Sequence, residues 1–561
     1  MKLKHIAFGI LILIIIGIIF ISIYVQQGGQ SVKDDFGCFP PSCSMIPDAS
    51  MRQFCEDWKA GKQVTWSTDC SSLPLEGCRK LCEYEKNTSV TTAEIPFAAP
   101  SKSPDYTIKF SVRVPENTPN YTSVWIEFRH HEGGWGPLLR MEKKSAYTWE
   151  IILKDIPSKQ YRYTRDEWSF TGAEEFSPDS KTAGRFIKEG ERKFNDTVKK
   201  WRWMPAPGEE ISQGIPTKAG QISFVPRVKN KEFQRGAVIA DFWWGNFHVL
   251  NSPHERLKKN NFKWLEVAPG WEYKQIDPLP IVGRVGYKDE EINLHLKMMK
   301  EDGFKILLQP SLSWGGFDLG RIPSSPEWWD AWFKRYEDFA LYFANLANKN
   351  DVDALLITGD EIATNEKPAN YQQRLEAIYS KVRQIYKGEL GRGFVLGRTI
   401  NQIDDLWPKV SDSILTTEWD FLAVRTGIGL TTKDDPAQEE LYLNVKKIFD
   451  LRFKPLYEQY QKPIVLSQVG YVSVDGALTG KVSADDPDAA MWEPYSDKYV
   501  LDLAEQAMAF EAFMKNVAET DYITGIYPFA YWPDDFPLSK ENNVRGKPAE
   551  EILSQWYKFI K

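Results

Sequence analysis

The chain has 561 residues, which is too long for one ordinary domain, so we expect about two to four domains. Its 70 basic and 77 acidic residues give a net charge of −7, which argues against a nucleic-acid-binding protein, because those carry a concentrated basic excess. Aromatic residues make up 14% of the chain. Their flat rings suit contact with the apolar faces of sugars, although the same residues also fill hydrophobic cores.

The N-terminal segment predicts a membrane anchor. Residues 6–25 are apolar except for Ser22 and Tyr24, and this length spans a bilayer as a helix. Two lysines precede the segment, so the positive-inside rule places the rest of the chain outside the cell. A cleavable signal peptide, and hence a secreted protein, is the alternative, but no small-x-small cleavage site follows. We expect a single-pass cell-membrane protein with a transmembrane signal anchor over residues 1–27.

The cysteines predict a small disulfide-rich module. All six lie between Cys38 and Cys82, and none follows in the rest of the chain. An even number of cysteines in a short exported segment indicates up to three bridges over residues 28–90, although the pairing does not follow from the sequence. A zinc site is the rival interpretation, but the spacing lacks two Cys-x-x-Cys pairs.

The next region alternates apolar and polar residues over four short stretches. This period of two, with turn residues between the stretches, predicts a small antiparallel β-sandwich over residues 91–204. The stretches are residues 106–114, 123–128, 147–153 and 160–164.

This region resembles a starch-binding type of carbohydrate-binding module. The matching pieces are residues 134–138, Trp149 before an apolar run, and Pro157 before residues 161–163. The resemblance implies that Trp135 stacks on glucan. A plain spacer beside a larger domain is the alternative interpretation.

A linker over residues 205–234 leads to a region in which apolar runs alternate with amphipathic stretches. Eight such βα units in about 330 residues predict a (β/α)8 TIM barrel over residues 235–561, so the fold class is α/β. The apolar runs are residues 236–244, 264–267, 304–310, 354–357, 394–397, 421–424, 464–466 and 523–527.

Two residues after these runs carry the expected chemistry. TIM barrels place catalytic groups at the C-terminal ends of their strands, where Glu361 follows the fourth run and Gln468 the seventh. A retaining glycosidase needs two carboxyl groups about 5 Å apart, one to protonate the leaving oxygen and one to attack the sugar. The sequence offers one carboxyl group and one amide at these positions.

The barrel resembles glycoside hydrolase clan A, in particular the endo-mannanase-like family 113. The resemblance rests on residues 358–361, on Gln468 where a Glu-x-Gly-Tyr pattern would be typical, on residues 527–532, and on the closing residues 544–550. It implies a glycosidase in which Glu361 is the general acid and Gln468 holds the nucleophile position. It also implies that Trp532 forms the floor under the −1 sugar.

Two departures from that family leave several interpretations open. Asp360 replaces the usual Asn, and Gln468 cannot act as a carboxylate nucleophile. A relocated second carboxylate would permit water attack, and the candidates are Asp241, Glu266, Glu272, Glu418 and Asp475. Asp360 and Glu361 together would suit a substrate-assisted hexosaminidase-type enzyme. A non-catalytic glycan-binding receptor on a disarmed barrel, or a function unrelated to carbohydrate, are the other interpretations.

The remaining site residues are aromatic. We expect them to contact substrate near the strand ends: Trp243, Trp244, Trp314 and Tyr471. Catalytic roles fall to Glu361, Gln468 and Asp360. No metal site, phosphate loop or other cofactor motif is predicted. The sequence therefore predicts a membrane-anchored extracellular glycoside hydrolase whose partners are a polysaccharide or oligosaccharide and the membrane, with no nucleic acid.

Overall fold

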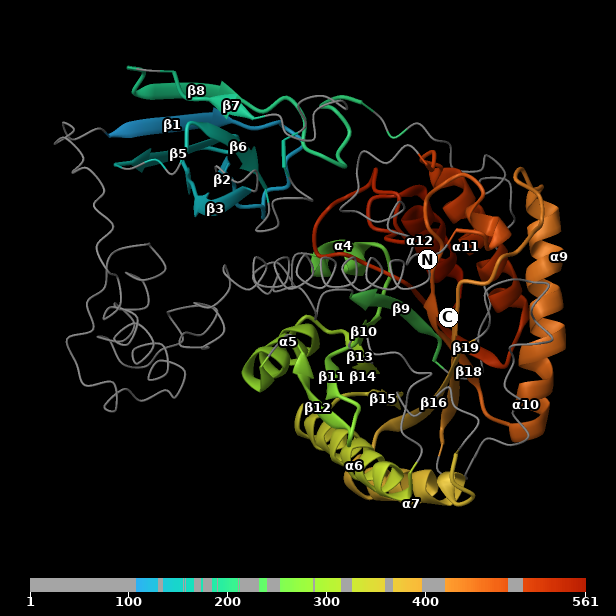
Figure 1. Cartoon of the computed structure of the whole chain (residues 1–561). Coiled ribbons are helices and arrows are strands. Elements are labelled where there is room, and N and C mark those ends of the chain that lie inside the picture. The colour runs from blue at the N-terminus through green and yellow to red at the C-terminus, as the bar shows by residue number, and fades with distance from the viewer. Residues whose placement is uncertain are drawn as a thin grey trace, which may run out of the picture. The chain divides into compact units, whose positions relative to one another are not determined.

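The computed structural model divides into two compact units, Met1–Ser103 and Pro104–Lys561 (Figure 1). The residues that it describes all belong to the second unit, and the predicted membrane anchor and cysteine module lie outside them. Among the described helices, none has both the length and the apolar character of a membrane span. The described residues are 107–129, 135–154, 156, 158–165, 173–174, 184–188, 190–209, 211, 232–239, 253–285, 288–313, 325–358, 367–395, 419–482 and 498–560.

The first part of this unit contains two four-stranded sheets, ordered β4-β5-β1-β8 and β3-β2-β6-β7. Their strands are β1 (Ile108–Arg113), β2 (Trp125–Arg129), β3 (Trp135–Arg140), β4 (Glu142–Lys143), β5 (Thr148–Leu153), β6 (Gln160–Thr164), β7 (Arg185–Phe186) and β8 (Lys193–Thr197). Aromatic rings join the two sheets, because Phe110 of β1 makes edge contacts with Phe128 of β2 and Tyr161 of β6. The centroid distances are 6.1 Å and 5.0 Å, which is ordinary core packing.

The expectation of a wholly antiparallel arrangement is wrong at one strand pair. β8 pairs with β1 in parallel, which places Phe194 beside Phe110 with their rings stacked at 5.1 Å. The chain reaches β8 from β7, which belongs to the other sheet. It therefore crosses between the sheets and enters beside β1 in the same direction.

The second part is a closed barrel of eight strands, as the sequence predicts, in the order β10-β13-β15-β16-β17-β18-β19-β9. Every neighbouring pair is parallel. The strands are β9 (Gln234–Ile239), β10 (Trp264–Val267), β13 (Lys305–Leu308), β15 (Ala354–Ile357), β16 (Glu389–Val395), β17 (Phe421–Thr426), β18 (Ile464–Val469) and β19 (Ile523–Pro528). A second sheet outside the barrel contains β11 (Gly270–Gln275), β12 (Ile281–Val285) and β14 (Ser311–Ser313).

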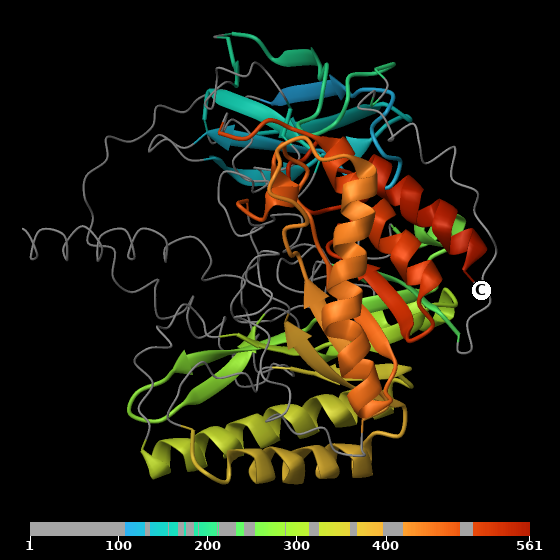
Figure 2. The same ribbon diagram turned by 90° about the vertical axis from the view of Figure 1, so that its right-hand side faces the viewer.

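Helices lie outside the barrel strands, and α6 and α7 run side by side (Figure 2). α6 begins after Ser325, whose side chain accepts a hydrogen bond from the Trp328 amide, and Pro326 occupies its first turn. Among the described residues, the regular helices are α4 (His254–Lys259), α5 (Asp289–Glu301), α6 (Pro326–Lys349), α7 (Tyr371–Ile385), α9 (Gln438–Ile448), α10 (Lys454–Tyr460), α11 (Leu503–Glu519) and α12 (Pro548–Phe559). A π-helical turn, Phe449–Phe453, joins α9 to α10, and Ala477–Thr479 forms a 3-10 turn.

Inside the barrel, glycines on two strands make room for aromatic rings from their neighbours. A Cβ atom on Gly236 of β9 would lie 2.1 Å from the ring of Tyr527 on β19, and one on Gly391 of β16 would lie 2.3 Å from the ring of Phe421 on β17. Both rings belong to the inner core of the barrel. Aromatic rings therefore fill the space beside these glycines, and the barrel interior has no room for a larger side chain at either position.

Gly236→Ala and Gly391→Ala should each lower the free energy of unfolding by about 1–3 kcal/mol, because the new methyl group overpacks the barrel. Gly283→Ala on β12 is the matched control, since its Cβ atom would meet only the flexible side chain of Lys274 at 3.3 Å. Urea denaturation measures all three variants. Equal midpoints for the barrel variants and the control would contradict this account of the interior.

Candidate active site

Three of the predicted site residues have described side chains: Gln468, Tyr471 and Trp532. Trp135 begins β3. The others lie outside the described residues: Glu361, Asp360, Trp243, Trp244 and Trp314. Because neighbouring strands are parallel, the C-terminal ends of β15 and β18 open at the same face of the barrel. Gln468 lies near the end of β18 at that face, whereas Glu361 comes four residues after the end of β15 in the chain and lies outside the described residues.

A one-residue bulge turns Gln468 toward the barrel interior. Val424 of β17 pairs with Leu466, but the next residue, Arg425, pairs with Gln468, so Ser467 is an extra residue on β18. Val465 faces the inner core, and strict alternation would turn Gln468 to the opposite face. The bulge restores the inward direction, so that Gln468 shares a face with Val465 and Arg425.

Gln468 hydrogen-bonds a buried carboxyl group on the second barrel strand. Its Nε2 donates to Glu266 Oε1 over 2.7 Å. Glu266 lies on β10, two residues after Trp264, which faces the inner core. The Glu266 side chain is 0% exposed, whereas Gln468 is partly exposed. Within the described part of the chain, no group hydrogen-bonds Glu266 Oε2.

Burial raises the pKa of the Glu266 carboxyl group to about 8. The hydrogen bond from Gln468 and the positive charge of Arg425 act in the opposite direction, because both favour the ionised carboxylate. These two effects are smaller than the effect of burial, which removes water from the charged carboxylate. Glu266 thus ionises around pH 8 and is mostly protonated at pH 7, which is the kind of shift that glutamates with functional roles in enzymes often show.

Glu266 is one of the five candidate second carboxylates, and the structure separates it from two others. Glu272 lies on β11, outside the barrel, and forms an ion pair with Lys274. Asp475 is exposed. The remaining two, Asp241 and Glu418, lie outside the described residues. Within the described part of the chain, Glu266 is the candidate that contacts Gln468.

Asp475 belongs to a group of three carboxylates, with Asp502 and Glu505, whose oxygen atoms lie within 4.8 Å of one another. Two of them have structural partners. Asp502 caps α11 by accepting hydrogen bonds from the Ala504 and Glu505 amides. Glu505 accepts the amides of Gly476 and Leu478. Backbone amides therefore occupy much of the acceptor capacity that a metal ion would need.

Tyr471 does not lie where a sugar-binding side chain is expected. It is 3% exposed, and its ring packs against Phe510 and Phe513 of α11. Its hydroxyl group donates to the Ile428 carbonyl over 2.9 Å. The chain turns away from the barrel mouth two residues after Gln468, so the structure places this tyrosine in the core between the barrel and α11.

Trp532, the predicted sugar platform, is fixed through its backbone. Its amide donates to Asn543 Oδ1 over 3.2 Å, and its carbonyl accepts from Arg545 Nη1 over 3.0 Å. Asn543 Oδ1 also accepts the Arg545 amide. Asn543 and Arg545 therefore fix the backbone of Trp532 in the loop that follows β19.

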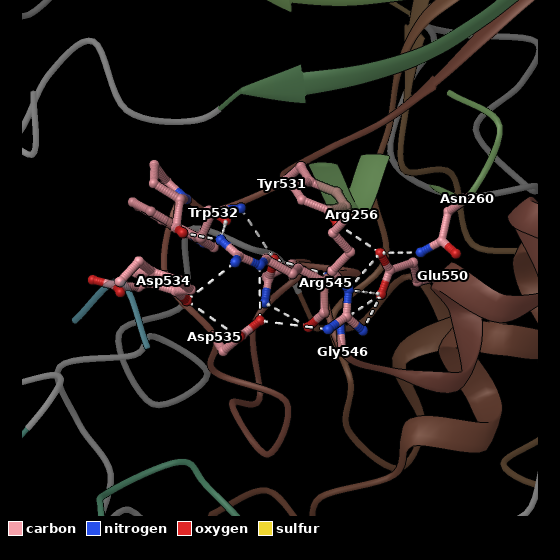
Figure 3. A network of polar contacts seen from close by, with 12 residues as sticks. Arg256, Asn260, Tyr531, Trp532, Asp534, Asp535, Arg545, Gly546 and Glu550 are labelled. Atoms are coloured by element: carbon pink, nitrogen blue, oxygen red, sulfur yellow. Dashed lines mark hydrogen bonds and ion pairs between the residues drawn. The ribbon is translucent and has the colours of Figure 1, made fainter. Parts of the chain in front are cut away.

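Arg545 is the centre of a buried polar network (Figure 3). It is 2% exposed, donates to the Pro533 carbonyl, and forms an ion pair with Asp535 over 2.8 Å. Tyr121, from the loop before β2, also bonds both partners: it donates to Asp535 Oδ2 and accepts from Arg545 Nη2. Burial alone would raise the pKa of Asp535, but the charges of Arg545 and Arg256 lower it. The network keeps Asp535 ionised and ties the loop to a segment more than 400 residues away.

The same network continues through Glu550 of α12. Arg256 of α4 donates two charge-assisted hydrogen bonds to Glu550 Oε2, at 2.7 Å and 2.9 Å. Tyr531 and Asn260 donate to Glu550 Oε1 over 2.6 Å and 2.8 Å (Figure 3). The end of the eighth strand is therefore held from both sides. No local sequence pattern indicates these contacts, because their partners are distant in the chain.

Arg545→Lys should lower the free energy of unfolding by about 2–4 kcal/mol, because lysine cannot reproduce the planar fork that bonds Asp535 and the carbonyl groups of Trp532 and Pro533 at once. Arg374→Lys is the matched control, since Arg374 pairs with Asp330 at an exposed site and exposed pairs contribute about 0–1 kcal/mol. Chemical denaturation compares the two variants. A control loss as large as that of Arg545→Lys would show that the network does not stabilise the loop.

A family model, Glycoside Hydrolase Family 113, matches residues 253–546, which is slightly more than half of the chain. Similar solved structures include a GH113 β-1,4-mannanase (16% identity, TM-score 0.44, 58% of this chain and 99% of that chain). They also include the GH113 β-mannanase of Alicyclobacillus acidocaldarius (18%, 0.45, 59% and 98%) and a GH53 catalytic domain of Ignisphaera aggregans (12%, 0.36, 60% and 100%). No curated protein sequence matches. Over its barrel, the chain belongs to glycoside hydrolase family 113.

Proposed function

We propose that this protein hydrolyses O-glycosidic bonds of poly- or oligosaccharides, with Glu361 as the general acid. The observation that carries the proposal is the inward-facing polar pair, Gln468 and Glu266, at the site-bearing end of a family 113 barrel. Polar groups inside a barrel are costly unless they have partners, and TIM-barrel enzymes concentrate them at this face.

Each residue has a distinct role in the proposed reaction. Glu361 protonates the leaving oxygen as the glycosidic bond breaks, while water adds to the anomeric carbon and loses its extra proton to a second carboxylate or to solvent. Gln468 hydrogen-bonds the −1 sugar but forms no glycosyl ester, because an amide is a poor nucleophile. Trp532 supplies an apolar platform, and Asp360 contacts the same sugar. Trp243, Trp244 and Trp314 follow the first and third barrel strands, where they line neighbouring subsites.

A glycan receptor is the second candidate, and one observation favours it. The residue at the nucleophile position is an amide, so the barrel lacks the usual carboxylate on β18. A receptor keeps the aromatic platform and needs no catalytic charge. A substrate-assisted hexosaminidase-type enzyme is a variant of the main proposal, in which Asp360 steers a 2-acetamido group of the substrate.

We also propose that the first two sheets bind glucan through Trp135 and that the protein is anchored in the cell membrane with its domains outside. The support for the anchor is the apolar run over residues 6–25 and the confinement of all cysteines to the segment that follows it. A membrane position would hold the barrel close to polysaccharide at the cell surface.

The test of the hydrolase uses the full chain in detergent with a panel of β-mannans, glucans and chitin oligosaccharides. Released reducing ends should appear with at least one substrate and fall by about 100-fold or more in Glu361→Gln, because general acid catalysis is lost. Activity that survives in Glu361→Gln would exclude Glu361 as the acid. Binding without any release would support the receptor, and release from 2-acetamido sugars alone would support substrate assistance.

Deletion of residues 1–27 should move the protein from the membrane fraction to the soluble fraction, because about 20 apolar residues anchor a chain stably. Alkaline carbonate washing separates an embedded chain from a merely adsorbed one. The full chain should stay with the membrane after this wash. Its release by carbonate, or a mature N-terminus beyond residue 25, would contradict the anchor.

A further inference from the structure

We propose that Glu266 is a positioning residue of the active site, which acts through Gln468 and supplies the negative charge that β18 lacks. This inference rests on the proposed hydrolytic function. In this view the carboxylate that the family carries on the seventh strand has been displaced to the second strand, and the amide of Gln468 transmits its effect to the sugar.

The geometry gives the two side chains different positions relative to substrate. Gln468 is partly exposed, whereas Glu266 is fully buried and touches the Gln468 amide nitrogen at 2.7 Å. A molecule that enters the barrel mouth therefore meets Gln468, with Glu266 behind it. Because Glu266 accepts one of the two Nε2 protons, Gln468 presents its other N–H and its carbonyl oxygen to other partners.

A carboxylate bonded to the amide nitrogen polarises the amide. Hydrogen bonds in a chain strengthen one another, and the effect is larger where water is excluded. The carbonyl oxygen of Gln468 then carries more negative charge than that of an isolated amide. The transition state of glycoside hydrolysis resembles an oxocarbenium ion, with positive charge on the sugar ring. A fixed negative group beside that ring stabilises the transition state more than the ground state.

The surroundings of Glu266 permit this charge without neutralising it. Among the described residues, two charged or titratable groups on other barrel strands act on it. Arg425 of β17 favours the carboxylate, and Tyr527 of β19 has its own ionisation opposed by Glu266. The Tyr527 hydroxyl group is engaged by Gln234, since it donates to Gln234 Oε1 over 2.9 Å. Neither group forms an ion pair with Glu266 that would cancel its charge.

Stability alone gives little reason for a carboxyl group at this position. A buried polar atom without a partner costs free energy, and Glu266 Oε2 has none within the described part of the chain. Apolar or neutral replacements of buried charges are often neutral or stabilising. A residue that costs stability and lies against a proposed substrate-binding group fits a functional role.

Glu266→Gln tests the proposal directly, because the new amide oxygen can still accept the Gln468 hydrogen bond while the charge is lost. We expect kcat to fall by about 100-fold or more, as for the loss of one electrostatic group in other enzymes. KM should stay within a factor of about three, since ground-state binding is retained. Thermal stability should be unchanged or higher. Glu511→Gln, a buried glutamate bonded to Tyr442 and Trp556 on the outer helices, is the matched control and should keep its activity.

The double variant Glu266→Gln with Gln468→Glu exchanges the two groups and keeps one carboxyl and one amide in contact. It should recover at least about tenfold in kcat over Glu266→Gln, because the charge returns beside the sugar. Gln468→Glu alone places two carboxyl groups within hydrogen-bonding distance, so that they share one proton and cannot both ionise near neutral pH.

The pH profile supplies a readout that a purely structural role would not move. Glu266 is charged above its pKa of about 8, so kcat/KM should rise as the pH increases toward 8 and this limb should vanish in Glu266→Gln. Unchanged kcat in Glu266→Gln, or a loss of kcat with the limb intact, would overturn the inference while leaving Glu361 as the acid. Activity that survives in Glu361→Gln, or the absence of any hydrolysis, would overturn the proposed function and this inference with it.

Discussion

The closure of the parallel barrel is the constraint on which the site depends. Closure requires eight short strands to fill a narrow interior, and Gly236 and Gly391 make this possible by giving their space to Tyr527 and Phe421. Once the barrel is closed, side chains from β10 and β18 meet although 202 residues separate them in the chain. The contact between Glu266 and Gln468 is therefore a product of the whole barrel and of no local motif.

The eight strands were predictable because each carries an apolar run long enough to stand out from its helices. The fifth strand was placed too late, since β16 begins at Glu389 and includes Gly391, Arg392 and Gly393, which look like a polar turn. Gly391 makes room for the Phe421 ring inside the barrel and does not form a turn. The bulge at Ser467 was not predictable either, because one extra residue leaves the composition of β18 unchanged while it reverses the face of Gln468.

The candidate site, like the fold, was predictable from the sequence only in part. A motif placed Gln468 at the end of the seventh strand, and a glutamate within the apolar run of β10 was a visible anomaly. The sequence could not choose Glu266 among five acids, because that choice depends on which strands face one another across the barrel. Tyr471 was misplaced because it follows the motif in sequence but turns into the core. Asn543 and Arg545 hold Trp532, and Arg545 in turn bonds Tyr121, to which no local pattern links it.

An amide at the nucleophile position is usually taken to mean a lost activity, but the physical question is where the negative charge lies. A strand-seven glutamine with no ionisable neighbour would leave the sugar ring without electrostatic support. Here the neighbour is a glutamate whose burial brings its ionisation close to neutral pH. Burial raises the free-energy cost of ionising Glu266, because the local dielectric constant is low. The same low dielectric constant strengthens the electrostatic effect of the charge across the Gln468 amide. In the proposed mechanism, the environment that makes the Glu266 charge costly to the fold would also strengthen its action on the substrate, which is the trade-off expected where function rather than stability selected the residue.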